Sequence, residues 1–209
     1  LEVIKREDRL DKIAQDIAYH FPRRGFLGKA MVVSVDKFTA VKMYDKVQHY
    51  WAIEKQNVIK ERNVAKTKEE RDRLTAILDY MGKVEMAVII SEDADENEKF
   101  SKQGLDIATH RAKMNYITPE GIDIEGRFKD VNDPLQLVFV CAMWLTGFDV
   151  PNLSTLYLDK PMKGHTLMQS PQPLHWVASI ITLSSLTVIA GQPSFIHILQ
   201  FLHLSVILQ

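Results

Sequence analysis

The sequence is short of cysteine, of net charge and, in its last part, of any charge at all. The single cysteine, Cys141, excludes an internal disulfide framework and fits a reducing compartment, so we expect a cytoplasmic protein. The 26 Lys and Arg residues nearly balance the 27 Asp and Glu residues, which leaves a formal net charge of -1. This balance excludes the global positive field that many polyanion-binding proteins carry. Any DNA contact must therefore come from a local site.

Leader, membrane and metal signals are also missing. The first 30 residues mix acidic and basic side chains without an apolar core of leader length, and the chain begins at Leu1, which suggests a piece of a longer protein. The uncharged residues 176–190 carry several Ser and Thr hydroxyls and fall short of the roughly 20 apolar residues of a membrane span. The histidines and the cysteine lack the spacing of metal ligands. We expect no membrane partner and no metal site.

Charge divides the chain into two unlike parts. All Asp, Glu, Lys and Arg residues lie between Glu2 and Lys163, whereas residues 164–209 contain none. The overall composition, 46% hydrophobic and 25% charged, is that of a globular protein. We therefore expect one folded domain over residues 1–169 and an atypical, uncharged hydrophobic tail over residues 170–209.

Apolar periodicity predicts an α/β fold. Helical spacing predicts helices over residues 9–21, 37–59, 68–81 and 119–129. Short apolar runs predict buried strands over residues 30–35, 84–90, 135–140 and 154–158. Strands that alternate with helices indicate a mainly parallel sheet covered by helices, in which ligands gather at the loops leaving the carboxyl ends of the strands.

Single residues refine this prediction. Asp36 is expected to cap the second helix, and Gly82 to end the third. The acidic residues 92–98 are expected to form a solvated loop. We interpret the pair His110 and Arg111 as a surface feature, and the aromatic residues of the second helix as core rather than base-stacking side chains. Those aromatic residues are Tyr44, Tyr50 and Trp51.

The loop after the third predicted strand has the most informative local sequence, which includes Thr146, Gly147 and Asp149. Glycine permits close backbone approach to a ligand, the Thr hydroxyl can bond a phosphate oxygen, and the Asp carboxylate can accept hydrogen bonds from a ribose or fix a cation. This combination suits a nucleotide or a nucleic-acid backbone. An ordinary turn uses the same residue types, so that alternative stays open. Trp144 is expected either to join this motif or to pack the loop.

The same region resembles a known family. The run FVCAMWLTGFDVPNLSTLYLDKPMKGHTLMQ, residues 139–169, is similar to motif V and the approach to motif VI of the motor subunit of type I restriction enzymes. That subunit, the R subunit, is a superfamily 2 helicase-like DNA translocase. Residues 28–47, GKAMVVSVDKFTAVKMYDKV, resemble its motif IV strand and helix, and residues 9–21 resemble the start of its second motor lobe. The similarity covers roughly residues 1–169.

The resemblance implies a RecA-like α/β lobe, the second of two that hold ATP between them and step along duplex DNA. It implies nucleotide-binding roles for Gly147 and Asp149, and DNA-binding roles for Ser34, Lys37 and Thr146. ATP and Mg²⁺ would serve the intact enzyme. Its partners would be double-stranded DNA, the first RecA-like lobe, and methyltransferase and specificity subunits. A separate nuclease domain would cut the DNA.

The chain departs from the family pattern in two ways. It has no phosphate-binding loop and no acidic magnesium motif, so we expect no catalytic residue and no activity from this piece alone. After Gln169 it reads Ser-Pro-Gln-Pro, where the family has the arginines of motif VI. One hypothesis is a shifted reading frame near Gln169. A divergent tail and a helix that packs on a partner are the alternatives for residues 170–209.

Two other functions stay open at this point. The chain could be a stand-alone, non-catalytic α/β interaction module whose apolar tail docks on a partner. It could also be a lobe of another superfamily 2 DNA helicase. A start codon just upstream would favour the module, and neighbouring methyltransferase and specificity genes would favour the restriction motor over another helicase.

Overall fold

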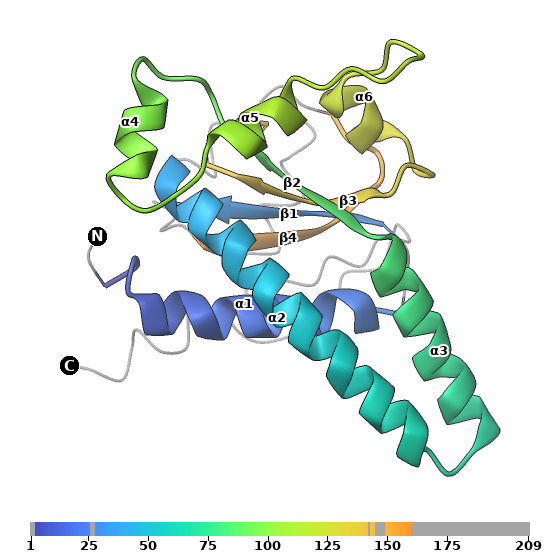
Figure 1. Cartoon of the computed structure of the whole chain (residues 1–209). Helices are drawn as coiled ribbons and strands as arrows, with labels where there is room; N and C mark the ends of the chain where they lie inside the picture. Colours follow the sequence, from blue (N-terminus) through green and yellow to red (C-terminus); the bar gives the residue numbers. More distant parts are fainter. Residues whose placement is uncertain (1–2, 26–27, 142, 145–148, 160–209) are drawn as a thin grey trace, which may run out of the picture.

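The computed structural model describes residues 3–25, 28–141, 143–144 and 149–159 of the chain. The described elements follow one another as α1 (Glu7–Arg23), β1 (Lys29–Ser34), α2 (Lys37–Val64), α3 (Lys68–Lys83), β2 (Glu85–Ile89), α4 (Glu96–Ser101), α5 (Ala108–Met114), α6 (Ile124–Lys129), β3 (Leu135–Val140) and β4 (Leu153–Asp159). The four strands form one parallel sheet in the order β2-β3-β1-β4, and helices cover it (Figure 1). The predicted α/β class is therefore confirmed.

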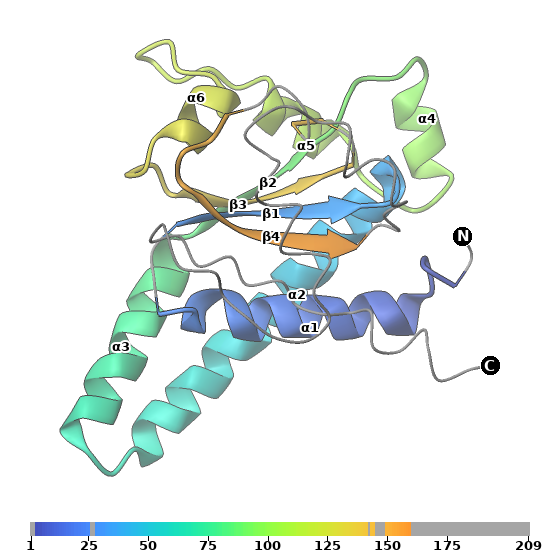
Figure 2. The same cartoon turned by 180° about the vertical axis from the view of Figure 1, so that it is seen from behind.

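The two central strands explain why the apolar runs of the sequence form a sheet. Every residue of β1 is buried, and β3 is buried except for the half-buried Gln136. Strands that lie between two others and are covered by helices need apolar side chains on both faces. The parallel register pairs Val33 with Val140 and Ser34 with Asp159, so the carboxyl ends of β1, β3 and β4 lie at the same edge (Figure 2).

The long helix α2 crosses the sheet and packs against two other helices, α1 and α3. Asp36 caps the start of α2, as predicted, because the Asp36 side chain accepts a hydrogen bond from the backbone N–H of Thr39 at 2.8 Å. Its buried side chains include Val41, Met43 and Val47. Helix α1 packs against α2, and α2 and α3 run together beyond the sheet as an antiparallel pair (Figures 1 and 2).

The structure confirms most predicted elements and corrects several details. Helix α2 continues to Val64, and α3 passes through Gly82 and ends at Lys83, so the prediction that Gly82 ends the helix is wrong. The acidic stretch is not only a loop, because α4 begins at Glu96. Of residues 119–129 only α6 is helical, since Gly121 lies in a turn with φ of +83°. Helix α5 was not predicted.

The pair on α5 is not a surface feature, which corrects our interpretation. His110 is 8% exposed and meets the ring of Tyr44 edge-on, with ring centroids 4.7 Å apart. Arg111 donates to both carboxylate oxygens of Glu96, at 2.9 and 2.7 Å, and to the backbone carbonyl of Ile90 at 3.1 Å. This ion pair joins α4 to α5 and lowers the pKa of Glu96.

The aromatic residues of α2 belong to the core, as predicted. Trp51 is buried, and its indole N–H donates to the backbone carbonyl of Met81 at 3.2 Å, which joins α2 to α3. Tyr44 and Tyr50 pack partly buried against the core. Among the described residues, no helix has both the length and the apolar character that a membrane crossing requires. The predicted tail, residues 170–209, lies outside the described residues.

Candidate functional site

The candidate site lies at the carboxyl edge of the sheet. Ser34 ends β1 and Asp159 ends β4, and the two are register partners on adjacent parallel strands, so their side chains point to the same face. Ser34 is 0% exposed and Asp159 is 2% exposed. Within the described part of the chain, Oγ of Ser34 and Oδ2 of Asp159 have no hydrogen-bond partner. Buried polar atoms usually have partners, so this spot is unusual for a sheet edge.

Asp159 is held by a residue from the other end of the chain. Nη2 of Arg9, on the first turn of α1, lies 2.5 Å from Oδ1 of Asp159. Burial raises the pKa of Asp159 above its usual value, and the hydrogen bond and charge of Arg9 oppose this shift. Sequence reasoning missed this pair. The one local signal was a carboxylate directly after the apolar run of β4.

Lys37 lies on the first turn of α2, beside the end of β1. Its Nζ is 2.7 Å from Oδ2 of Asp93, and its side chain is 23% exposed. The hydrogen bond from Lys37 lowers the pKa of Asp93, with smaller contributions from the charges of Lys99 and Arg111. Lys37 is therefore a partly exposed cation at the carboxyl edge, as the loop positions in the sequence predicted.

Part of the predicted loop can be placed. Asp149 is exposed, and Val150 directly after it is buried. Trp144 stacks on Phe128 of α6, with ring centroids 5.6 Å apart, and has a φ of +64°. Packing of Trp144 against the domain is the second of the two roles we expected for it. Thr146 and Gly147 lie outside the described residues, so their roles stay predictions.

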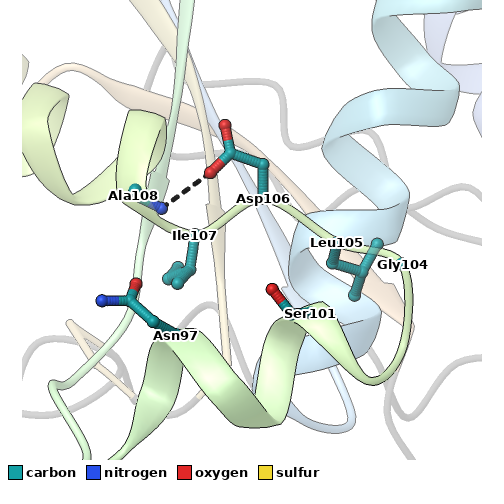
Figure 3. Close-up of a pocket in the computed structure, with 7 residues that line it drawn as sticks. All are labelled: Asn97, Ser101, Gly104, Leu105, Asp106, Ile107 and Ala108. Atoms are coloured by element: carbon teal, nitrogen blue, oxygen red, sulfur yellow. Dashed lines mark hydrogen bonds between the residues drawn. The ribbon is translucent and has the colours of Figure 1, made fainter.

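A separate hollow of about 430 Å³ lies between α4 and the start of α5. Asn97 and Ser101 project from α4 toward Ile107 (Figure 3). The carboxylate of Asp106 accepts hydrogen bonds from the backbone N–H groups of Ala108, at 2.9 Å, and Thr109, at 3.4 Å. These bonds hold the pKa of Asp106 low, after the larger effect of the Thr109 hydroxyl. Asp106 therefore shapes the loop before α5.

The described residues also limit what this part of the chain can bind. They contain no group of three His, Cys, Asp or Glu side chains placed to hold a metal ion. Of the residues predicted to bind nucleotide, the structure describes Asp149, which offers one exposed carboxylate. A magnesium nucleotide needs several oxygen ligands and a phosphate cradle. One carboxylate does not supply these ligands.

The sequence of the chain is similar to those of known proteins. The family model described as T1R_D3-like, type I restriction enzyme subunit R domain 3, matches residues 28–171. The type I restriction enzyme HindI endonuclease subunit of Haemophilus influenzae is 30% identical over 171 residues, 81% of this chain and 13% of the relative. Two putative type I restriction enzyme endonuclease subunits of Methanocaldococcus jannaschii are also similar. MjaIXP is 33% identical over 172 residues (81% of this chain, 13% of the relative), and MjaVIIP is 28% identical over 172 residues (80% and 14%).

Proposed function

Because the chain belongs to the family described as type I restriction enzyme subunit R domain 3, we propose that it is the second RecA-like lobe of the ATP-dependent DNA translocase in an R subunit. One observation carries the proposal. The matched residues 28–171 include all four strands of the parallel sheet, and so the carboxyl edge where α/β sheets bind ligands. The chain spans 13 or 14% of the length of its relatives, so the remaining parts of such an enzyme would lie outside it.

Lys37 is the DNA-binding candidate that the described geometry favours. It is partly exposed, and its partner Asp93 is an exposed carboxylate that a backbone phosphate could replace. Ser34 has no exposed surface, so its proposed contact with DNA requires the edge to open. One phosphate contact contributes modestly to affinity and weakens with salt, so tight binding would come from the assembled enzyme.

Thr146, Gly147 and Asp149 form the proposed coupling loop. Thr146 would contact the DNA backbone, and Gly147 and Asp149 would face ATP in the cleft between the lobes. ATP would supply the energy of stepping and Mg²⁺ would neutralise its phosphates, both held mainly by the first lobe, which carries the phosphate-binding loop. Asp149 is exposed, which leaves its carboxylate accessible to a ligand of this kind.

The proposed partners are those of a type I restriction-modification system. They are double-stranded DNA, the first RecA-like lobe, and the methyltransferase and specificity subunits. DNA cleavage, as in a type I site-specific deoxyribonuclease, would belong to a nuclease domain elsewhere in the subunit. The lobe would occupy residues 1–169 and work in the cytoplasm.

The tail, residues 170–209, is proposed to be out-of-frame translation. Its support is the joint loss of charge and of the motif VI arginines after Gln169. Sequencing the coding DNA tests this hypothesis. An arginine-bearing continuation in another frame, together with nearby methyltransferase and specificity genes, would support both the tail hypothesis and the restriction motor. Frames without any such arginine motif would contradict the tail hypothesis.

ATP hydrolysis tests the proposed function. Residues 1–169 alone should hydrolyse ATP at background rate, whereas the two-lobed parent subunit should hydrolyse it faster when duplex DNA is added. In that parent, Lys37→Ala should weaken the DNA stimulation severalfold. Lys83→Ala, which removes an exposed lysine at the opposite end of the sheet, is the matched control and should change little. ATP hydrolysis above background by residues 1–169 would contradict the proposal. So would a parent subunit whose rate of ATP hydrolysis does not rise when duplex DNA is added.

A further inference from the structure

Helix α1 and strand β4 are joined by a row of polar contacts. Alternate residues of a strand share a face, and three of them on β4 carry polar side chains that contact α1 or Arg24, the residue that caps its carboxyl end. The contacts run from Nη1 of Arg24 to Oγ1 of Thr155 at 2.6 Å, from Nδ1 of His20 to Oη of Tyr157 at 2.9 Å, and from Nη2 of Arg9 to Oδ1 of Asp159 at 2.5 Å. The row begins near the amino end of β4 and ends at the carboxyl edge.

Two ion pairs fasten the start of the chain to that edge. Arg9 pairs with Asp159 at the end of β4. Lys5, just before α1, pairs with Asp36, which caps α2 directly before Lys37. Lys5 and Arg9 therefore attach the start of α1 to both sides of the candidate site, although β4 is far from them in the sequence.

The charge of Asp159 makes Arg9 the important member of this row. A carboxylate with 2% exposure loses most of its hydration, and burial raises the pKa of Asp159. Arg9 opposes that shift, and its side chain stays 31% exposed. If one member of a buried ion pair is removed, the other charge is left uncompensated, so the end of β4 would have to rearrange.

We propose that Arg9 is a positioning residue of the motor. Through Asp159 it fixes the carboxyl end of β4 to α1, so that α1 and the carboxyl edge move as one body. This inference rests on the proposed function, in which the first lobe precedes α1 and must transmit its nucleotide-dependent movement to the DNA contacts of this lobe. Asp159 holds the far end of that connection, beside its register partner Ser34.

The test uses the two-lobed parent subunit with its methyltransferase and specificity partners. The variants are Arg9→Met, Asp159→Asn and the double variant, which leaves no buried charge uncompensated. Lys42→Met is the matched control, because it removes the ion pair between Lys42 of α2 and Glu7 of α1, which does not involve β4. The readouts are the thermal unfolding midpoint and the ATP consumed per base pair of DNA travelled.

We expect the double variant to fold, to hydrolyse ATP in response to DNA, and to consume at least about fivefold more ATP per base pair, the lower range of coupling between sites. Lys42→Met should match the wild type, and Arg9→Lys should restore part of the coupling. An unchanged ratio, or a double variant that does not fold, would give Arg9 a structural role only and overturn the inference. A wild-type parent without DNA-stimulated hydrolysis would overturn the proposed function, and the inference with it.

Discussion

At the scale of single residues, His110 should make the stability of the domain sensitive to mild acid. Burial, which disfavours the charged imidazolium, lowers the pKa of His110 below its usual 6.5, Asp106 opposes the shift, and Lys113 adds to it. The unfolded chain therefore binds the proton more readily than the folded one. The contribution of His110 to the free energy of unfolding is complete above pH 6.5 and is lost as the pH falls through the folded pKa.

His110→Phe tests this dependence, because phenylalanine keeps an aromatic ring against Tyr44 but cannot take up a proton. Urea unfolding from about pH 7 to about pH 5 should lose less stability in the variant than in the wild type, where one proton contributes at most about 1.4 kcal/mol per pH unit. His49→Phe, at an exposed position of α2, is the control and should follow the wild type. Parallel curves for all three proteins would contradict the prediction.

Gly28 occupies a position where the fold leaves no room for a side chain. Its φ is +156°, and a Cβ atom there would lie 2.6 Å from Cβ of Ser154 on β4. Gly28→Ala should therefore lower the free energy of unfolding by about 2–4 kcal/mol, by forcing β1 away from β4. Gly104→Ala separates backbone strain from collision, because Gly104 has a φ of +69° in open space, and should cost about 1 kcal/mol. Equal costs in chemical denaturation would argue against the collision.

At the scale of elements, α3 shows how packing overrides a local signal. A glycine near the end of an amphipathic pattern commonly terminates a helix, yet α3 passes Gly82 without a positive φ. The helix ends one residue later, at Lys83, where the N–H of the following Val84 donates to the carbonyl of Tyr80 at 3.1 Å and the chain turns into β2. The position of β2 in the sheet therefore sets the end of α3.

Gly82→Ala is expected to stabilise the protein. A Cβ at this position meets nothing within 4 Å, and alanine in a helix is favoured over glycine by up to about 1 kcal/mol. The free energy of unfolding should rise by about 0.5–1 kcal/mol in chemical denaturation. The matched control is Ala76→Gly at an exposed position of the same helix, which should lower it by a similar amount. A loss of stability in Gly82→Ala would mean that this glycine does serve as a cap.

The strands could be predicted from the sequence, whereas the contacts between elements could not. Apolar runs identified all four strands, because a strand covered on both faces needs several consecutive apolar residues. Strand ends in turn placed Ser34 and Lys37 at the carboxyl edge. The ion pairs of Arg9 with Asp159 and of Glu96 with Arg111 depend on how elements pack, so no local pattern identifies which residues pair. The burial of Asp159 could not be foreseen for that reason.

At the scale of the whole molecule, the first and the last described elements contact each other. The last described strand, β4, lies beside β1, and the first helix contacts β4 through its row of polar side chains. The described core runs from Leu10 to Tyr157. A domain whose first and last elements contact each other gains its cooperativity when both are present, and here both lie within residues 7–159.

Removal of residues 170–209 should therefore leave the cooperative unfolding of the domain intact and improve its solubility. The midpoint of thermal unfolding should change by less than about 2–4 °C, the shift that 1 kcal/mol causes in a domain of this size. Solubility should rise because the uncharged residues 176–208 are rich in apolar side chains, which promote association when exposed. Light scattering and calorimetry of residues 1–169 and 1–209 provide the comparison. Equal solubility with two monomeric proteins would contradict the prediction of association, and a midpoint that falls well beyond that range would show that the tail stabilises the lobe.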